Sequence, residues 1–120
     1  MRKIVGFFIV LICSFPAFAQ EQLSESDKIA ALLDAFSTSD ITFIRNGEEH
    51  DGKYAREHLE AKLKETKDIN TGEDFISKVA STSKETGKPY LIKLKDGTQI
   101  ECAKWLRDYL KQVEDTELVE

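Results

Sequence analysis

The chain has 120 residues, of which the first nineteen have the pattern of a secretory signal, so the mature protein would have 101. That length suits one domain, and 35 apolar residues suffice for one modest core, which argues against a disordered chain. The mature part has 15 basic and 22 acidic residues, a net charge of −7, and no basic cluster, which argues against nucleic acid or an anionic membrane surface as a partner.

The N-terminus predicts export. Arg2 and Lys3 form a positive n-region, residues 4–15 form an apolar h-region, and Ala17-Phe18-Ala19 supplies the small residues that a signal peptidase accommodates. The apolar run is shorter than the ~20 residues that span a bilayer. We therefore expect cleavage after Ala19 and a periplasmic protein with no membrane insertion after cleavage.

Removal of the signal leaves one cysteine. Without Cys13, Cys102 has no partner, so no intramolecular disulfide can form, and core packing must hold a monomeric domain together. Cys102 could lie at a helix N-terminus, where the dipole lowers the pKa of a thiol. The favoured alternative is a small buried residue that ends a strand.

The first half of the mature chain predicts a helix, a strand and a second helix. The first helix starts at a cap at Ser26 or Asp27. A strand, Ile41–Arg45, follows and ends at the turn signal Asn46-Gly47. The second helix runs from Asp51-Gly52 to about Thr66. The apolar positions that repeat at helical spacing in these two helices are Ile29, Leu32, Leu33 and Phe36, then Ala55, Leu59 and Leu63.

The second half predicts two more helices and a hairpin. A capping pattern at Thr71 to Asp74 precedes a third amphipathic helix, and residues 81–89 form a polar loop. The strands Tyr90–Leu94 and Gln99–Cys102 flank the turn Asp96-Gly97. The last helix contains Trp105, Leu106, Tyr109, Leu110 and Val113, and the acidic residues from about 114 to 120 are expected to fray.

Together these elements predict an α+β fold: residues 20–120 form one globular domain of about four amphipathic helices packed on a small antiparallel sheet of two or three strands. Trp105 and Phe36 are the expected large anchors of its core.

Short stretches across the mature chain resemble the YfeK-like family of small exported bacterial proteins, a domain of unknown function. The resemblance supports the export and the fold and implies no activity, cofactor or substrate. The residues that carry it, in order, are Ser39, Phe43-Ile44-Arg45-Asn46-Gly47, His58-Leu59, Lys62, Asp74-Phe75-Ile76, Gly87-Lys88-Pro89-Tyr90-Leu91-Ile92, Asp96-Gly97 and Trp105-Leu106.

Patterns that could carry catalysis or a cofactor are weak. The run Glu48-Glu49-His50-Asp51, with His58, matches no established metal-ligand spacing and is typical of a solvated loop. Thr86-Gly87-Lys88 resembles the end of a phosphate loop, but Pro89 replaces its Ser or Thr. No Gly-x-Ser-x-Gly elbow is present. We therefore expect no cofactor, no metal and no catalytic residues.

The second helix contains the most informative pattern. At about 100° per residue, Tyr54, His58 and Lys62 lie within its apolar face. One interpretation is that Lys62 extends its ammonium to water while His58 bonds a backbone carbonyl. The other is a small basic pocket, roofed by Tyr54 and the loop of residues 81–86, that accepts a carboxylate or phosphate. Arg45, at the end of its strand, either forms an ion pair with a nearby acid or joins that recognition.

These observations favour a non-catalytic periplasmic domain that binds a protein partner or a small anionic ligand, with His58, Lys62, Arg45 and Tyr54 as the candidate binding residues. The alternatives are an inhibitor or immunity-type protein that blocks another protein's active site, and a small envelope enzyme that uses His58.

Overall fold

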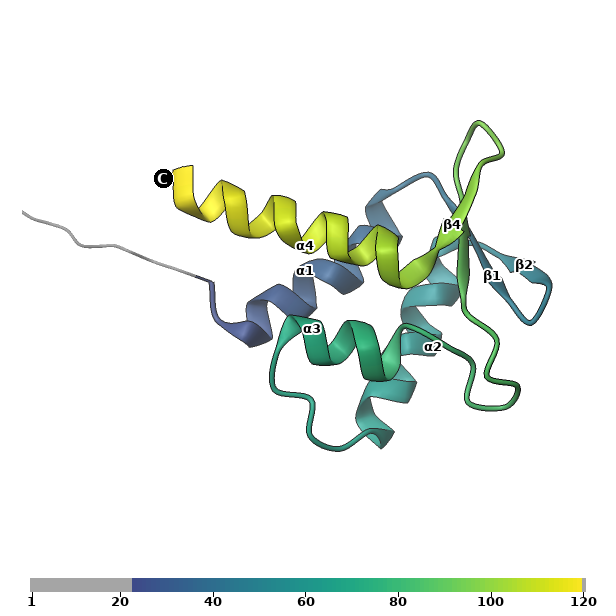
Figure 1. Cartoon of the computed structure of the whole chain (residues 1–120), viewed down its shortest axis with the longest axis horizontal. Coiled ribbons are helices and arrows are strands. Elements are labelled where there is room, and N and C mark those ends of the chain that lie inside the picture. The colour runs from purple at the N-terminus through teal and green to yellow at the C-terminus, as the bar shows by residue number, and fades with distance from the viewer. Residues whose placement is uncertain (1–22, 120) are drawn as a thin grey trace, which may run out of the picture.

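The computed structural model describes residues 23–119, and the predicted signal, residues 1–19, lies outside this part (Figure 1). No helix in residues 23–119 has the length and apolar character needed to cross a membrane. The elements in chain order are α1 (Glu25–Thr38), β1 (Thr42–Arg45), β2 (Glu48–His50), α2 (Gly52–Glu65), α3 (Gly72–Asp74), the π-helix η3 (Phe75–Val79), β3 (Leu91–Lys93), β4 (Gln99–Glu101) and α4 (Cys102–Val119).

The strands form one antiparallel sheet in the order β2-β1-β3-β4. The α+β prediction is confirmed, but the expected two or three strands were wrong because the sheet has four. The missed strand is β2, whose sequence is typical of a solvated loop. Its Glu-Glu-His sequence has little β-propensity. It pairs with β1 because Asn46 (φ 52°) and Gly47 (φ 84°) adopt the left-handed backbone of a tight hairpin turn.

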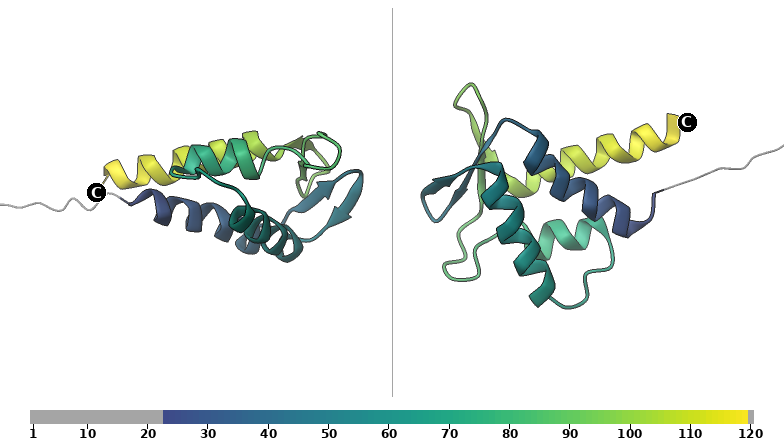
Figure 2. Two further views of the ribbon diagram at one scale, coloured as in Figure 1. Left: turned by 90° about the horizontal axis from the view of Figure 1, so that it is seen from below. Right: turned by 180° about the vertical axis from the view of Figure 1, so that it is seen from behind.

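The register of the sheet decides which side chains face the helices. Phe43 pairs with His50 on one side and with Ile92 on the other, so these three side chains share a face. Phe43 and Ile92 are fully buried against the helices. Arg45, two residues after Phe43, therefore points to the same face, at the end of β1. The sheet lies at one end of the helices, and α4 extends away from it (Figures 1 and 2).

The core joins the sheet to all the helices. Phe36 is an anchor as predicted, at 1% exposure, whereas Trp105 is only partly buried and packs with its ring 5.2 Å from that of Phe36. The largest side chains with less than 2% exposure are Tyr90, Phe36, Phe43, Phe75, Leu32, Leu59, Ile76, Ile92 and Leu106.

The helix starts follow capping rules, with one shift. Ser24, rather than Ser26 or Asp27, caps α1 and accepts from the amide of Asp27 at 3.0 Å. Asp51 caps α2 as predicted, accepting from the amide of Tyr54 at 2.9 Å.

The third predicted helix differs from an ordinary α-helix. Thr71 caps it as expected, accepting from the amide of Asp74 at 2.9 Å, but only Gly72–Asp74 is α-helical. The next turn is the π-helix η3, which ends with the Ala80 amide donating to the Phe75 carbonyl at 3.0 Å. Ala80 is buried, like Phe75, Ile76 and Val79. The wide turn therefore keeps four apolar side chains in the core immediately before the loop of residues 81–90.

The last helix is longer than expected. α4 continues to Val119, so the acidic segment expected to fray begins within the helix. Its first residue, Glu114, pairs with Lys28 of α1 at 3.2 Å. This contact joins α1 and α4 at the end of the molecule away from the sheet.

Gly52 allows α1 and α2 to approach closely. A Cβ at Gly52 would overlap the backbone carbonyl of Phe36, which cannot move without distorting the end of α1. At an unobstructed helical position alanine is favoured over glycine by about 0.5–1 kcal/mol. We expect Gly52→Ala to lower the free energy of unfolding by about 1–3 kcal/mol instead. Urea denaturation measures this.

The matched control is Lys53→Ala, at the exposed next position, which should change stability by less than about 0.5 kcal/mol. Equal or higher stability of Gly52→Ala would show that the two helices do not meet as closely as described.

Candidate functional site

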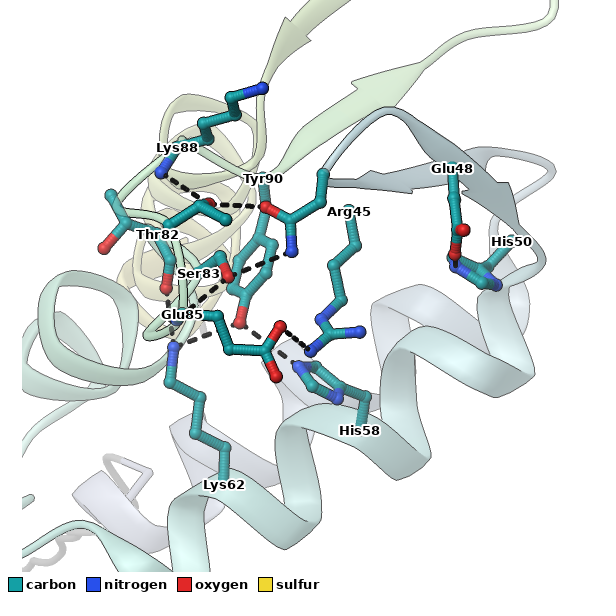
Figure 3. A network of polar contacts seen from close by, with 12 residues as sticks. Arg45, Glu48, His50, His58, Lys62, Thr82, Ser83, Glu85, Lys88 and Tyr90 are labelled. Carbon is teal, nitrogen blue, oxygen red and sulfur yellow. Dashed lines mark hydrogen bonds and ion pairs between the residues drawn. The ribbon is translucent and has the colours of Figure 1, made fainter.

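A pocket of about 290 Å³ lies between α2, the end of β1 and the loop of residues 81–90. Figure 3 shows the polar side chains that meet there, from three separate parts of the chain. Its lining combines three cationic side chains with two carboxylates. The lining residues are Arg45, His58, Ala61, Lys62, Glu65, Lys84, Glu85 and Tyr90.

Helical spacing aligns the α2 side chains along one wall, as predicted. The rings of Tyr54 and His58 stack with centroids 5.8 Å apart at an angle of 4°. His50 of β2 extends the stack, with its ring 3.7 Å from that of Tyr54. Tyr54 itself is not a lining residue of the pocket, so it supports His58 from the side and does not form the roof that was expected.

The hydroxyl of Tyr90 connects α2 to the sheet. It accepts a hydrogen bond from Lys62 Nζ at 3.1 Å and lies 3.2 Å from His58 Nε2. The ring is 1% exposed and packs 5.0 Å from Phe43. On the backbone, the Tyr90 amide donates to Ser81 and its carbonyl accepts from Cys102. Tyr90 is therefore fixed from both ends, and only its hydroxyl edge reaches the pocket.

Lys62 has only neutral partners. Its ammonium donates to the Thr82 carbonyl at 2.7 Å and to the Tyr90 hydroxyl, and lies 4.9 Å from the Tyr90 ring centroid. No carboxylate in residues 23–116, the part whose side chains the structure describes, forms an ion pair with it. Burial lowers the pKa of Lys62, and the positive charges of Lys84 and Arg45 lower it further. The ammonium is half-buried and is held by oxygens that carry no charge.

His58 is held by a side chain rather than by the backbone. Its partner is the Tyr90 hydroxyl, whereas one interpretation of the sequence expected a backbone carbonyl. Burial lowers the pKa of His58, and Arg45 and Lys62 lower it further because a third positive charge beside them is unfavourable. At neutral pH the imidazole is uncharged and can exchange a hydrogen bond with the hydroxyl in either direction.

Arg45 lies on the opposite side of the pocket from Lys62 (Figure 3). It donates through Nη1 to the Tyr54 hydroxyl at 3.4 Å and through Nη2 to Glu85 at 3.2 Å. Its buried Nε has no hydrogen-bond partner in the described part of the chain. The expected ion pair is present, but its carboxylate comes from the loop, 40 residues further along the chain.

Hydrogen bonds to the β1–β2 turn hold the loop in place. Asn46 donates to the hydroxyl of Ser83 at 3.2 Å, and Thr86 donates to the Asn46 side-chain oxygen. Ser83, 2% exposed, also accepts from the amide of Glu85. These contacts place Lys84 and Glu85 at the pocket. The sequence predicted that the loop of residues 81–86 covers the pocket, but it did not single out Lys84, Glu85 or Tyr90 as lining residues. For Tyr90, the alternation with Ile92 indicated that its side chain faces inward.

The other sequence candidates do not form a site. Cys102 starts α4, but it is fully buried, and burial raises the pKa of its thiol, contrary to the lowering considered for a helix N-terminus. Glu48 approaches His50 only to 3.8 Å. Within residues 23–119 no group of three or more His, Cys, Asp or Glu side chains could hold a metal ion.

Comparison with known proteins gives the family of this chain. Residues 23–114 match the model of a family of unknown function, DUF5329. The chain belongs to this family. It is also 45% identical over 92 residues to the uncharacterized protein YfeK of Salmonella typhimurium, which covers 75% of this chain and 77% of that protein. The resemblance found from the sequence is confirmed. Residues 23–114, the segment that the family model matches, contain every lining residue of the pocket. No solved structure matches the chain significantly.

The lowered pKa of His58 predicts how stability depends on pH. The unfolded chain takes up this proton near pH 6.5, and the folded chain does so only at lower pH. The free energy of unfolding should therefore rise with pH between the folded pKa and about 6.5. NMR titration of the ring protons gives the pKa, and denaturation at several pH values gives the stability. The rise in the free energy of unfolding should be smaller in His58→Gln. A pKa of His58 above 6.5 in the folded protein would contradict a half-buried imidazole beside two cations.

The Arg45–Glu85 pair should contribute little to stability, because the Glu85 side chain is 70% exposed. A double-mutant cycle with Arg45→Gln and Glu85→Gln should give a coupling of about 0.2–1 kcal/mol. Lys95 and Asp40, an exposed pair at the same distance of 3.2 Å, provide the comparison. A coupling above about 2 kcal/mol would instead assign Arg45 to a structural ion pair.

Proposed function

We propose that the chain is an exported periplasmic domain that binds a small anionic group, a carboxylate or a phosphate, in the pocket between α2 and the loop of residues 81–90. The anion belongs to a small ligand or to a protein partner. The observation that carries the proposal is the half-buried ammonium of Lys62, which pairs with no carboxylate among the described side chains of residues 23–116.

Burial explains why an anion would bind there. Taking an ammonium out of water without a counter-charge costs several kcal/mol. Neutral oxygens of Thr82 and Tyr90 recover part of this cost. An anion that enters the pocket recovers more, because it meets Lys62, Arg45 and Lys84 together. A purely structural lysine would be expected to have a carboxylate partner, as Lys28 does.

The net charge of the whole protein is opposite in sign to that of the pocket. The predicted mature chain is acidic, at −7, yet the pocket has three cations and two carboxylates. Glu65, Glu85 and Lys84 are exposed, and Arg45 and Lys62 are the more buried charges. A locally positive, partly enclosed site on an acidic protein focuses the field on one place. This arrangement favours a specific anion over general attachment to anionic surfaces.

The proposed export rests on the sequence of residues 1–19, with its positive start, apolar run and Ala17-Phe18-Ala19. A single buried cysteine in the remaining chain is compatible with an oxidising compartment, since it offers no thiol for exchange. An inhibitor or immunity-type protein would use the same pocket, with an acidic side chain of its target as the anion.

One observation favours the competing proposal of an envelope enzyme. An uncharged His58 lies 3.2 Å from the Tyr90 hydroxyl, within reach for proton exchange. However, burial raises the pKa of Tyr90, so the hydroxyl keeps its proton and does not become a base or a nucleophile. The pair is better suited to donating hydrogen bonds to an anion than to turning over a substrate.

The test is Lys62→Met, which removes the ammonium and keeps most of the apolar stem. We expect at least a tenfold loss of affinity for acetate and for inorganic phosphate, measured by NMR titration at low ionic strength. Stability should stay within about 1.5 kcal/mol of the wild type, because lost hydrogen bonds are offset by removal of a desolvated charge.

Lys64→Met, at an exposed position on the same helix and outside the pocket, is the matched control and should bind as the wild type does. Unchanged binding in Lys62→Met, or a wild type that binds neither anion, would overturn the proposal. So would unfolding of Lys62→Met, which would make the lysine part of the structure.

A further inference from the structure

We propose, building on the anion-binding function above, that the natural ligand presents a terminal carboxylate and that Glu85 is a tethered competitor for its place on Arg45. In the structure the carboxylate of Glu85 accepts from Arg45 Nη2 at 3.2 Å at the border of the pocket. This contact is the one that a ligand carboxylate would make. The carboxylate of Glu85 thus occupies the position on Arg45 that the carboxylate of the proposed ligand would take.

The Glu85 side chain is free to leave Arg45. Its side chain is 70% exposed, and its carboxylate has no partner other than Arg45 in the described residues. Its backbone amide, by contrast, bonds to the buried Ser83. The side chain can therefore swing into solvent while the loop backbone stays in place. Arg45 is more constrained, because its side chain is 24% exposed and its Nη1 donates to the Tyr54 hydroxyl.

The chemistry of Arg45 favours a carboxylate over other anions. Exchange of one carboxylate for another leaves the charge and the hydrogen bonding of Arg45 unchanged, whereas a dianionic phosphate adds a charge that Glu65 and Glu85 repel. From Arg45 the ligand reaches a second cation, Lys62, across the pocket (Figure 3).

The size of the pocket sets how much of the ligand it encloses. Its volume of about 290 Å³ is at the lower limit for sites that enclose a whole small molecule, which typically measure roughly 300–1,000 Å³. The pocket thus suits the end of a chain, such as the last residue of a peptide. The remainder of such a ligand would lie outside, over the loop and the end of α2.

The experiment compares Glu85→Gln with the wild type for one probe and its uncharged form. The probe is N-acetylglycylglycine, which ends in one carboxylate, and the control probe is its C-terminal amide. Loss of the competitor should tighten binding of the carboxylate about two- to fivefold, the range expected for an exposed ion pair. The amide should not bind either protein. NMR titration of the His58 ring and the α2 amides gives both affinities.

Glu65→Gln is the matched control, since it removes a carboxylate that lines the same pocket and forms no ion pair with Arg45. A clear gain in Glu85→Gln with a smaller one in Glu65→Gln supports a competitor. Equal gains in affinity for the two variants would show that only the net charge of the pocket matters, and would overturn the proposal that Glu85 is a competitor. Weaker binding in Glu85→Gln would overturn it as well. If inorganic phosphate bound more tightly than N-acetylglycylglycine, the proposal that the natural ligand presents a terminal carboxylate would be overturned.

The outcomes also separate this inference from the proposed function. If the wild type binds anions through Lys62 but Glu85→Gln binds the carboxylate no more tightly, the proposal of a competitor fails and the proposal of anion binding stands. If neither the wild type nor Glu85→Gln binds any of the probes, both proposals fail together.

Discussion

The site depends on a single buried hydroxyl. Tyr90 contributes its ring to the core and its oxygen to the pocket, so it links apolar packing to a polar network. Without that oxygen, Lys62 would have only a carbonyl partner, and His58 would face an apolar wall. Because the network is partly enclosed, each hydrogen bond is stronger than it would be in water, and each missing partner costs more. The hydrogen-bond network of the pocket therefore depends on the packing of Tyr90 in the core.

This arrangement resolves a conflict that the sequence contains. A lysine and a histidine within the apolar stripe of α2 oppose the simplest packing of an amphipathic helix. The fold places them at the edge of the core, where the loop of residues 81–90 covers them with backbone and hydroxyl oxygens. Local rules that fail at one place while holding elsewhere are typical of functional positions. The helix thus packs normally along Ala55 and Leu59 and departs from the pattern only beside the pocket.

The parts that could be predicted from the sequence are those governed by short-range rules. Helical spacing placed Tyr54, His58 and Lys62 on one face, and the Asn46-Gly47 signal gave the hairpin turn. The strand β2 was missed because pairing across that turn overrides the weak β-propensity of its charged residues. Tyr90, Lys84 and Glu85 were missed for a different reason. The sequence predicted that the loop of residues 81–86 covers the pocket. Which of its side chains line the pocket depends on contacts made over some 20 to 40 residues of chain, which no local pattern encodes.

The hydrogen bonds of Asn46 have a consequence for motion. One residue supplies the left-handed backbone of the β1–β2 turn and, through its side chain, holds the loop at Ser83 and Thr86. Lifting the loop away from the turn therefore requires the loss of both hydrogen bonds to the Asn46 side chain. A change in the backbone of the turn at Asn46 therefore also displaces the side-chain groups that hold the loop against the pocket. One wall of the pocket is thereby anchored to the β1–β2 turn at the edge of the sheet.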